Sequence, residues 1–336
     1  MADTTKIEWT DATWNPITGC TVHSAGCTNC YAMQLAGTRL RNHPSRKGLT
    51  REVNGNHVWT GEVRFNEQWL LQPLQWKRPR DIFVCAHADL FHGFVPDAWI
   101  DKIFAVMAMA SHHRFQVLTK RSDRMRAYMT RPDLRADLLD AASHLTDDWK
   151  WQARGVWNAE TWPLPNVWLG VSVEDQKAAD ERIPDLLATP AAIRWLSCEP
   201  LLGPVDLNSV KRWSECNIPE YGGEGYEFIS CLRGGLDWIV CGGESGPNAR
   251  PMHPDWARSL RDQCAAAGVP FHFKQWGEWV PGGHPAAAAL PATSLGDQMK
   301  LMAKSGQFPD GQSMFLVGKK AAGRLLDGVQ HDGVPT

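Results

Sequence analysis

Short apolar runs alternate with helix-like stretches along most of this 336-residue chain. Each run has the length and composition of a strand that is buried on both faces, as strands of parallel sheets are. The runs cover residues 81–89, 114–121, 166–175, 193–200, 237–246 and 270–277. Helix start signals lie between several of them, in residues 95–111, 179–190 and 253–268. With two shorter strands expected near 14–19 and 62–65, the alternation amounts to about eight βα units.

This pattern predicts an α/β fold, a (β/α) barrel that is either a full or a partial TIM-like barrel. An open, doubly wound parallel sheet is the alternative, because it uses the same alternation of elements. Two Trp- and Gly-rich stretches, 138–165 and 208–235, interrupt the pattern and are interpreted as insertions. From about residue 280 the core pattern fades. We therefore expect a barrel domain over residues 1–280 and a C-terminal tail or lid over 281–336, in which 319–328 forms a docked segment.

The charge of the chain is nearly balanced, with a formal net charge of −2. A protein without a general basic field contacts nucleic acid only through a local patch. Segments 39–51 and 75–80, which are rich in basic side chains, are the candidates for such a patch. No apolar run approaches the ~18 residues that span a bilayer, and the N-terminus does not resemble a signal peptide. We therefore expect a cytoplasmic protein without a membrane segment.

Charged side chains follow nearly every predicted strand. They are His87 and Asp89, Lys120 and Arg121, Glu174 and Asp175, Glu199, Glu244, and Lys274. Because ligands of α/β folds bind beyond the carboxyl ends of the strands, these positions predict a polar site at one end of the sheet. The run Gly242-Gly243-Glu244 adds a place where backbone can approach a ligand closely. Ion pairs between neighbouring strand ends are the alternative interpretation.

Nine cysteines, an odd number in a chain without an export signal, do not indicate a disulfide framework. Three of them form a Cys-x6-Cys-x2-Cys motif, Cys20, Cys27 and Cys30, in a loop between the first strand and a helix. Clustered thiols bind metal or take part in redox chemistry. A zinc site needs a fourth ligand, which His23 could supply, whereas a 4Fe–4S cluster with three cysteines keeps one iron open.

Longer stretches resemble a known family. They are KIEWTDATWNPITGC, GCTNCYA, DLFH, FQVLTKR, VWLGVSVED, RIPDLLATPAAIRWLSCEPLLGP, GGESGPNARPMHPDWARSLRDQC and FHFKQWG, between about residues 6 and 277. In these stretches the chain is similar to the three-cysteine-motif phage proteins, an uncharacterised family of phages and bacterial genomic islands. The three-cysteine loop after the first strand also resembles the radical S-adenosylmethionine superfamily, although the first two cysteines lie farther apart here than in its usual loop.

The resemblance implies that Cys20, Cys27 and Cys30 hold three irons of a 4Fe–4S cluster and that S-adenosylmethionine binds the fourth. An electron from a flavodoxin- or ferredoxin-type donor would then cleave the sulfonium and yield a 5′-deoxyadenosyl radical. Residues expected to bind the cofactors are Tyr31, Lys120, Arg121, Glu174, Glu199, Gly242, Gly243, Glu244 and Lys274.

Cys198 ends a strand and is a candidate catalytic thiol that returns a hydrogen atom to a product radical; an inert buried thiol is the alternative. The phage association and the basic segments favour a nucleic-acid substrate, as in the spore photoproduct lyase branch of the superfamily. Two other function classes remain open. One is a non-catalytic binding protein whose N-terminal loop is held by a structural zinc ion, with the three cysteines and His23 as its ligands. The other is a metal-free barrel enzyme whose strand-end carboxylates act as acid and base.

Overall fold

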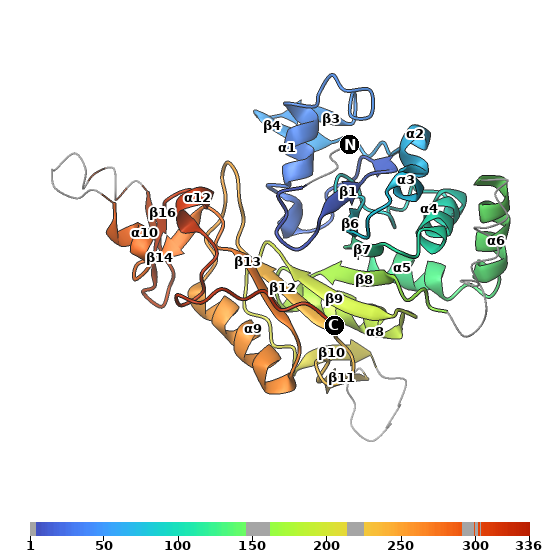
Figure 1. Ribbon diagram of the computed structural model, residues 1–336. Helices are drawn as coiled ribbons and strands as arrows, with labels where there is room; N and C mark the ends of the chain where they lie inside the picture. Colours follow the sequence, from blue (N-terminus) through green and yellow to red (C-terminus); the bar gives the residue numbers. More distant parts are fainter. Residues whose placement is uncertain (1–4, 146–161, 214–224, 291–298, 300–301, 303) are drawn as a thin grey trace. The chain divides into compact units, whose positions relative to one another are not determined.

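The computed structural model describes residues 5–145, 162–213, 225–290, 299, 302 and 304–336 (Figure 1). The chain divides into two compact units. Unit 1 comprises residues 1–171 and 185–195, and unit 2 comprises residues 172–184 and 196–336. The predicted domain boundary near residue 280 therefore falls inside unit 2, and residues after 280 belong to the same unit as the strands before it.

Seven strands form one parallel sheet, and their order in the sheet is their order in the chain. They are β1 (Ala12–Trp14), β6 (Asp81–Val84), β7 (Arg114–Thr119), β8 (Val167–Ser172), β9 (Ile193–Cys198), β12 (Trp238–Gly242) and β13 (Phe271–Gln275). The order contains no reversal, whereas a doubly wound sheet reverses at its switch point. The α/β class with a partial TIM-like strand order is thus confirmed, and the doubly wound alternative is wrong. Closure into a full barrel is not shown, because β1 and β13 stand at the two ends of the order.

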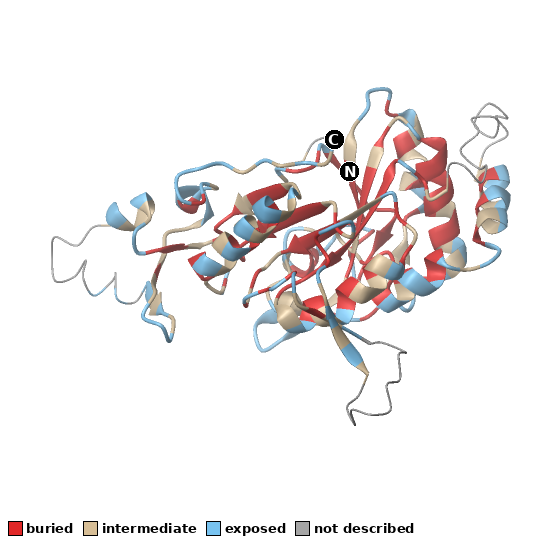
Figure 2. Ribbon diagram, turned by 90° about the horizontal axis from the view of Figure 1, so that it is seen from below, coloured by how far each residue is buried: buried red, intermediate tan, exposed pale blue. Residues whose placement is uncertain are grey.

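Most residues in the strands of this sheet are buried (Figure 2). In unit 1, Ala12, Thr13 and Trp14 of β1 pair with Ile82, Phe83 and Val84 of β6, and β6 pairs in turn with β7. The longer helices of this unit are α4 (Asp97–Met109), α5 (Ser122–Met129) and α6 (Leu134–Leu145). Helix α4 begins directly after Pro96, whose fixed φ suits a helix start, and buries most of its residues.

The segment between β1 and β6 contains only short elements. They are β2 (Ile17–Thr18), a 3-10 turn at Ala25–Cys27, α1 (Tyr31–Gly37), β3 (Thr50–Val53), β4 (Asn56–Trp59), β5 (Arg64–Phe65), α2 (Glu67–Leu70) and α3 (Gln72–Gln75). The strand predicted at 62–65 exists as β5, but the prediction that it adds a βα unit is wrong. β5 runs antiparallel to β2 in a separate two-stranded ribbon, so it cannot join the parallel sheet.

In unit 2, helix α9 (Pro254–Ala267) matches the helix predicted at 253–268. The His253 side chain caps its first turn by accepting a hydrogen bond from the Asp255 N–H, and Gly268 ends it with φ +71°. Helix α8 (Gln176–Ala188) begins in unit 2, and its last residues fall in the range 185–195 of unit 1. The insertion at 208–235 contributes the antiparallel ribbon of β10 (Val210–Trp213) and β11 (Tyr226–Ile229). Of the insertion at 138–165, α6 supplies the first residues, and 146–161 lie outside the described residues.

Residues after 280 complete unit 2. A three-stranded antiparallel sheet joins β14 (Trp279–Pro281), β16 (Ser313–Leu316) and β15 (Ser305–Gln307), with short helices α10 (Pro285–Ala288) and α12 (Lys319–Ala322). The predicted docked segment packs on the end of β13, because the Trp276 indole N–H donates to the Leu325 carbonyl at 2.9 Å and Leu326 is fully buried.

The free edge of β13 is covered by residues 331–333. The Phe273 N–H donates to the His331 carbonyl at 2.9 Å, and the Gly333 N–H donates to the Phe271 carbonyl at 3.0 Å. This pairing occupies the side of β13 that faces away from β12. In the described part of the chain, no helix is both long and apolar enough to cross a bilayer.

Candidate functional site

The three-cysteine loop leaves the ribbon strand β2 at Gly19. Gly19 has φ +97°, and a Cβ at this position would clash with the Glu62 carbonyl, so only glycine fits here. The Gly19 N–H donates to the His87 carbonyl at 3.2 Å, and Gly19 forms a parallel bridge with Ala88. The loop is therefore fixed alongside the segment that follows the carboxyl end of β6.

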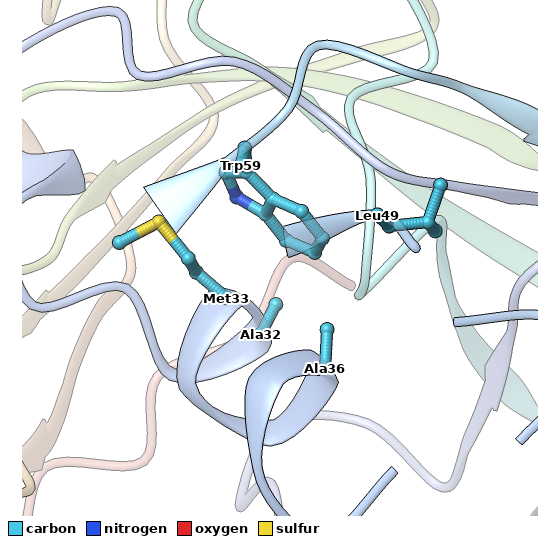
Figure 3. Close-up of a cluster of buried hydrophobic side chains, with 5 residues drawn as sticks. All are labelled: Ala32, Met33, Ala36, Leu49 and Trp59. Carbon is cyan, nitrogen blue, oxygen red and sulfur yellow. The ribbon is translucent and has the colours of Figure 1, made fainter. Parts of the chain in front are cut away.

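Two of the three thiols rest on a small apolar cluster. Ala32, Met33 and Ala36 of α1 form it together with Leu49 and Trp59 (Figure 3). Cys20 and Cys30 pack against this cluster from the loop side. Cys30 also occupies the N-cap position of α1, where the N–H groups of Ala32 and Met33 point at its sulfur. These N–H groups act to lower the pKa of the Cys30 thiol, but the effect of burial is larger.

All three thiols are free and partly exposed. Burial raises the pKa of Cys20 to about 12, with Asp89 acting in the same direction, while Arg121 opposes this rise. Burial also raises the pKa of the Cys30 thiol, and a negative charge on Cys27 would raise it further. The three sulfurs therefore lie within electrostatic range of one another. Ligation of a metal has to displace their protons, so binding would be favoured by rising pH.

We compared the donor set with the two metal groups that the sequence leaves open. Among the described residues, no three or more His, Cys, Asp or Glu side chains converge on the position of a single ion. In an iron–sulfur cluster each cysteine binds a different iron, so its ligands stand farther apart than those of one zinc ion. Three soft sulfur donors on one loop, two of them against an apolar wall, fit a cluster in donor type and number. His23 is exposed, and its backbone N–H contacts the Cys27 sulfur at 3.5 Å.

An ion pair anchors the loop to the ends of β6 and β7. Arg121 donates to Asp89 Oδ2 at 2.8 Å, and both side chains are largely buried. The same guanidinium reaches Cys20 Sγ at 3.9 Å and donates to Thr21 Oγ1 at 2.7 Å. Asp89 also accepts hydrogen bonds from the Thr119 hydroxyl and the Lys120 N–H. One arginine thus connects the buried carboxylate to the first cysteine of the motif.

His92 supports the same loop from its other side. Its Nδ1 accepts a hydrogen bond from the Phe94 N–H at 3.2 Å, so in the neutral ring Nε2 carries the proton and donates to Thr21 Oγ1 at 3.0 Å. Burial, together with the charge of Arg121, lowers the pKa of His92 to about 4. The imidazole is therefore neutral at neutral pH.

His92 predicts a specific pH dependence of stability. Because its pKa is about 4 in the folded chain and ordinarily about 6.5, the unfolded chain binds more protons between these values. The free energy of unfolding should therefore fall as the pH drops from 6.5 towards 4, with His92 contributing up to about 1.4 kcal/mol per pH unit. His92→Gln should flatten this slope in urea unfolding curves, and His144→Gln, in an exposed ring, should not. An unchanged slope in His92→Gln would show that His92 titrates normally.

The other predicted cofactor residues of unit 1 also lie near the loop. The Tyr31 hydroxyl, on the first residue of α1, donates to the Ala86 carbonyl at 2.5 Å, and about half of the side chain is exposed. The ammonium group of Lys120 acts to lower the pKa of Cys30, which places it within electrostatic range of that thiol. Tyr31, Lys120 and Arg121 thus lie near the cysteine loop, and their binding of a cofactor remains a prediction.

Three of the four predicted strand-end carboxylates in unit 2 contact a cation, whereas Asp175 accepts a hydrogen bond from the Ala178 N–H at 2.9 Å. Glu174 pairs with Arg182 at 2.8 Å, Glu199 with Lys274 at 3.1 Å, and Glu244 with Arg250 at 2.6 Å. Glu174 and Arg182 are almost completely buried. This is the ion-pair arrangement that the sequence leaves as an alternative. A paired carboxylate is a weaker general base than an isolated one, so these contacts do not favour the metal-free acid–base enzyme.

The two glycines of the Gly-Gly-Glu run have packing roles within unit 2. A Cβ on Gly242 would stand 2.5 Å from Glu199 Oε1, and one on Gly243 would clash with the Trp276 carbonyl. Both glycines therefore allow close approach between β12 and its neighbours. Their role in binding S-adenosylmethionine remains a prediction.

Cys198 is fully buried. Burial raises the pKa of its thiol, and Cys264 of helix α9 acts in the same direction. A side chain next to α9 lies on the face of the sheet that this helix covers. That position favours the inert packing role, and the hydrogen-donor role remains a prediction.

Part of the basic segment 39–51 is structural. Arg46 is 5 % exposed, and its guanidinium stacks over the Trp69 ring and donates to Ser45 Oγ at 2.5 Å. Arg46 is therefore not available as a surface phosphate contact. Sequence reasoning also missed Thr21 and His92 as supports of the cysteine loop, although His92 belongs to the DLFH stretch.

We compared the chain with protein families, curated proteins and solved structures. A family model described as a protein of unknown function (DUF5131) matches residues 4–335. The search of curated proteins and the search of solved structures each return no match.

Proposed function

Since the chain belongs to the DUF5131 family of proteins of unknown function, its activity has to be argued from its own residues, and we propose that it is a radical S-adenosylmethionine enzyme. The observation that carries this proposal is the set of three free thiols on one loop beside the carboxyl end of β6, with Arg121 reaching the first of them. Ligands of parallel α/β folds bind at this end of the strands.

Cys20, Cys27 and Cys30 would hold the cluster, and Tyr31, Lys120 and Arg121 stand close enough to act on what binds beside it. When bound, the 4Fe–4S cluster and S-adenosylmethionine supply one-electron chemistry that yields a 5′-deoxyadenosyl radical. The positive charges of Lys120 and Arg121 favour the thiolate forms of the neighbouring cysteines. Asp89 keeps Arg121 in place, and the apolar cluster under Cys20 and Cys30 keeps water from one side of the loop.

The test is anaerobic reconstitution with iron and sulfide, followed by reduction with dithionite or a flavodoxin-type donor. We expect an oxygen-sensitive chromophore, iron and acid-labile sulfide in a ratio near one, and release of 5′-deoxyadenosine from S-adenosylmethionine. Stoichiometric zinc without sulfide would instead support the zinc-stapled protein. A reduced, intact cluster that leaves S-adenosylmethionine uncleaved, with and without nucleic acid, would rule out the radical enzyme.

We further propose nucleic acid as the substrate, with a repair or base-modifying reaction. Arg39, Arg41 and Lys47 of segment 39–51 are candidates for phosphate contacts, and their exposure supports this. Gel-shift titration of single- and double-stranded DNA and RNA at two salt concentrations tests it. Binding that weakens with salt is expected, and no binding at low salt would remove nucleic acid as the substrate class.

A further inference from the structure

Unit 2 contains a cavity of about 670 Å³, and none of the candidate site residues lines it. One wall is the turn 246–249, which follows the Gly-Gly-Glu run after β12. The opposite wall is formed by residues 316–318 at the end of β16, with Glu278, Trp279 and Lys304 between the two walls. The cavity therefore lies between a strand-end loop and the small sheet formed after residue 278.

Glu278 holds the two walls together. Its carboxylate accepts a hydrogen bond from the Gly246 N–H at 2.9 Å and another from the Lys319 N–H at 3.1 Å. Its backbone carbonyl accepts from the N–H groups of Val317 and Gly318 at 3.0 and 3.1 Å. Because both walls are tied to one residue, the cavity exists before any ligand arrives.

Trp279 supplies the aromatic surface of the cavity. Its indole N–H donates to the Ala249 carbonyl at 2.6 Å, so the ring reaches from β14 to the turn 246–249. Since the polar atom of the indole is already bonded, the ring can give the cavity only apolar and aromatic contact. Leu316, which pairs with Trp279 across the sheet, extends the apolar surface. A ligand with a planar heteroaromatic ring can stack on an indole of this kind.

Lys304 supplies the charge. Its side chain is exposed, and in the part of the chain that the structure describes no carboxylate forms an ion pair with it. The Lys304 carbonyl accepts a hydrogen bond from the Leu316 N–H at 2.8 Å, which fixes the backbone from which the ammonium extends. An ammonium group at the rim of an aromatic cavity selects a ligand that carries an anionic group beside its ring.

We propose that this cavity binds a nucleobase that is linked to an anionic group, with the base on Trp279 and the anion at Lys304. Two sources share this chemistry: the adenosyl group of S-adenosylmethionine with its carboxylate, and a nucleoside monophosphate unit of a nucleic acid. The assignment rests on unit 2 alone. It can therefore succeed or fail independently of a cluster on the three cysteines.

Isothermal titration calorimetry on the full chain, without added iron, tests the assignment. The probes are AMP, dTMP, S-adenosylhomocysteine, uncharged adenosine, and ribose 5-phosphate, which lacks a base. We expect AMP, dTMP or S-adenosylhomocysteine to bind, and ribose 5-phosphate to bind at least about tenfold more weakly. Preference for the monophosphates identifies a nucleic-acid unit as the source, and preference for S-adenosylhomocysteine identifies the adenosyl cofactor.

Variants separate the two contacts. Lys304→Met should weaken the anionic probes about tenfold and leave adenosine unchanged, because it removes only the charge. Lys320→Met, in an exposed lysine outside the cavity, is the matched control and should change nothing. Trp279→Leu should weaken every base-containing probe, and Trp279→Phe, which keeps an aromatic face, should restore part of the affinity. Absence of saturation with all probes, equal binding of AMP and ribose 5-phosphate, or full affinity in Lys304→Met would each overturn the proposal.

Discussion

Replacing Cys20, Cys27 or Cys30 by alanine is expected to reduce cluster-bound iron and sulfide to background and to abolish release of 5′-deoxyadenosine. In the proposed cluster each thiol would be one of three protein ligands, so losing one would leave two irons without a protein ligand. The change should be all-or-none rather than graded. Iron and sulfide analysis, together with the absorbance of the reconstituted protein, measures it.

Buried cysteines elsewhere serve as controls. Cys231→Ala and Cys264→Ala remove thiols that lie in the core of unit 2 and should leave iron and sulfide content unchanged. Cys85 and Cys241 are likewise buried, and Cys216 lies outside the described residues. His23→Ala should spare an iron–sulfur cluster but weaken a Cys3His zinc site. Full cluster content in any of the three loop variants would contradict the assignment of the ligands.

Replacing Asp89 by alanine is expected to destabilise the protein by about 3–5 kcal/mol, the usual cost of leaving a buried charge without its partner. Arg121 is largely buried and forms its ion pair with Asp89, which also accepts hydrogen bonds from Thr119 and Lys120. Loss of the carboxylate would free the guanidinium and with it the Thr21 end of the cysteine loop. Urea unfolding measures the change in the free energy of unfolding.

Two comparisons make this prediction specific. Glu227→Ala removes the exposed ion pair with Arg212 and should cost about 1 kcal/mol or less. The double variant Asp89→Ala/Arg121→Met should be less destabilised than Asp89→Ala, because no unpaired charge remains in it. The free energy of unfolding of the double variant is compared with those of Asp89→Ala and Arg121→Met. If its loss equals the sum of the two single losses, Asp89 and Arg121 do not stabilise each other.

The main strands could be predicted because each is a short apolar run with charged residues at its end. Burial on both faces produces that pattern, and β6, β7, β8, β9, β12 and β13 all lie inside the predicted ranges. β5 shows where the pattern fails. Two residues are enough to pair with β2 in a ribbon, and nothing in their composition reveals whether the partner runs parallel or antiparallel.

The candidate site could be predicted only in part. The spacing of the three cysteines located the loop, and the strand-end rule located Lys120, Arg121 and Asp89. The contact of Thr21 with His92 joins residues that are 71 positions apart, and no local pattern encodes such a pair. In unit 2 the strand-end rule predicted binding residues where the structure has ion pairs. Their charges are as regular in sequence as those of unit 1, yet Glu174, Glu199 and Glu244 each form an ion pair with a cation.

The pairing of residues 331–333 with the edge of β13 has a consequence for the chain during its synthesis. More than fifty residues separate Gln275, the last residue of β13, from His331. His331 pairs with the outer edge of β13. At about 5–20 residues per second, a nascent chain exposes that bare strand edge for several seconds before its cover is synthesised. An unpaired edge is a template for pairing with other chains. A chain shortened before residue 331 is therefore expected to aggregate rather than simply lose a tail, because the edge of β13 stays unpaired.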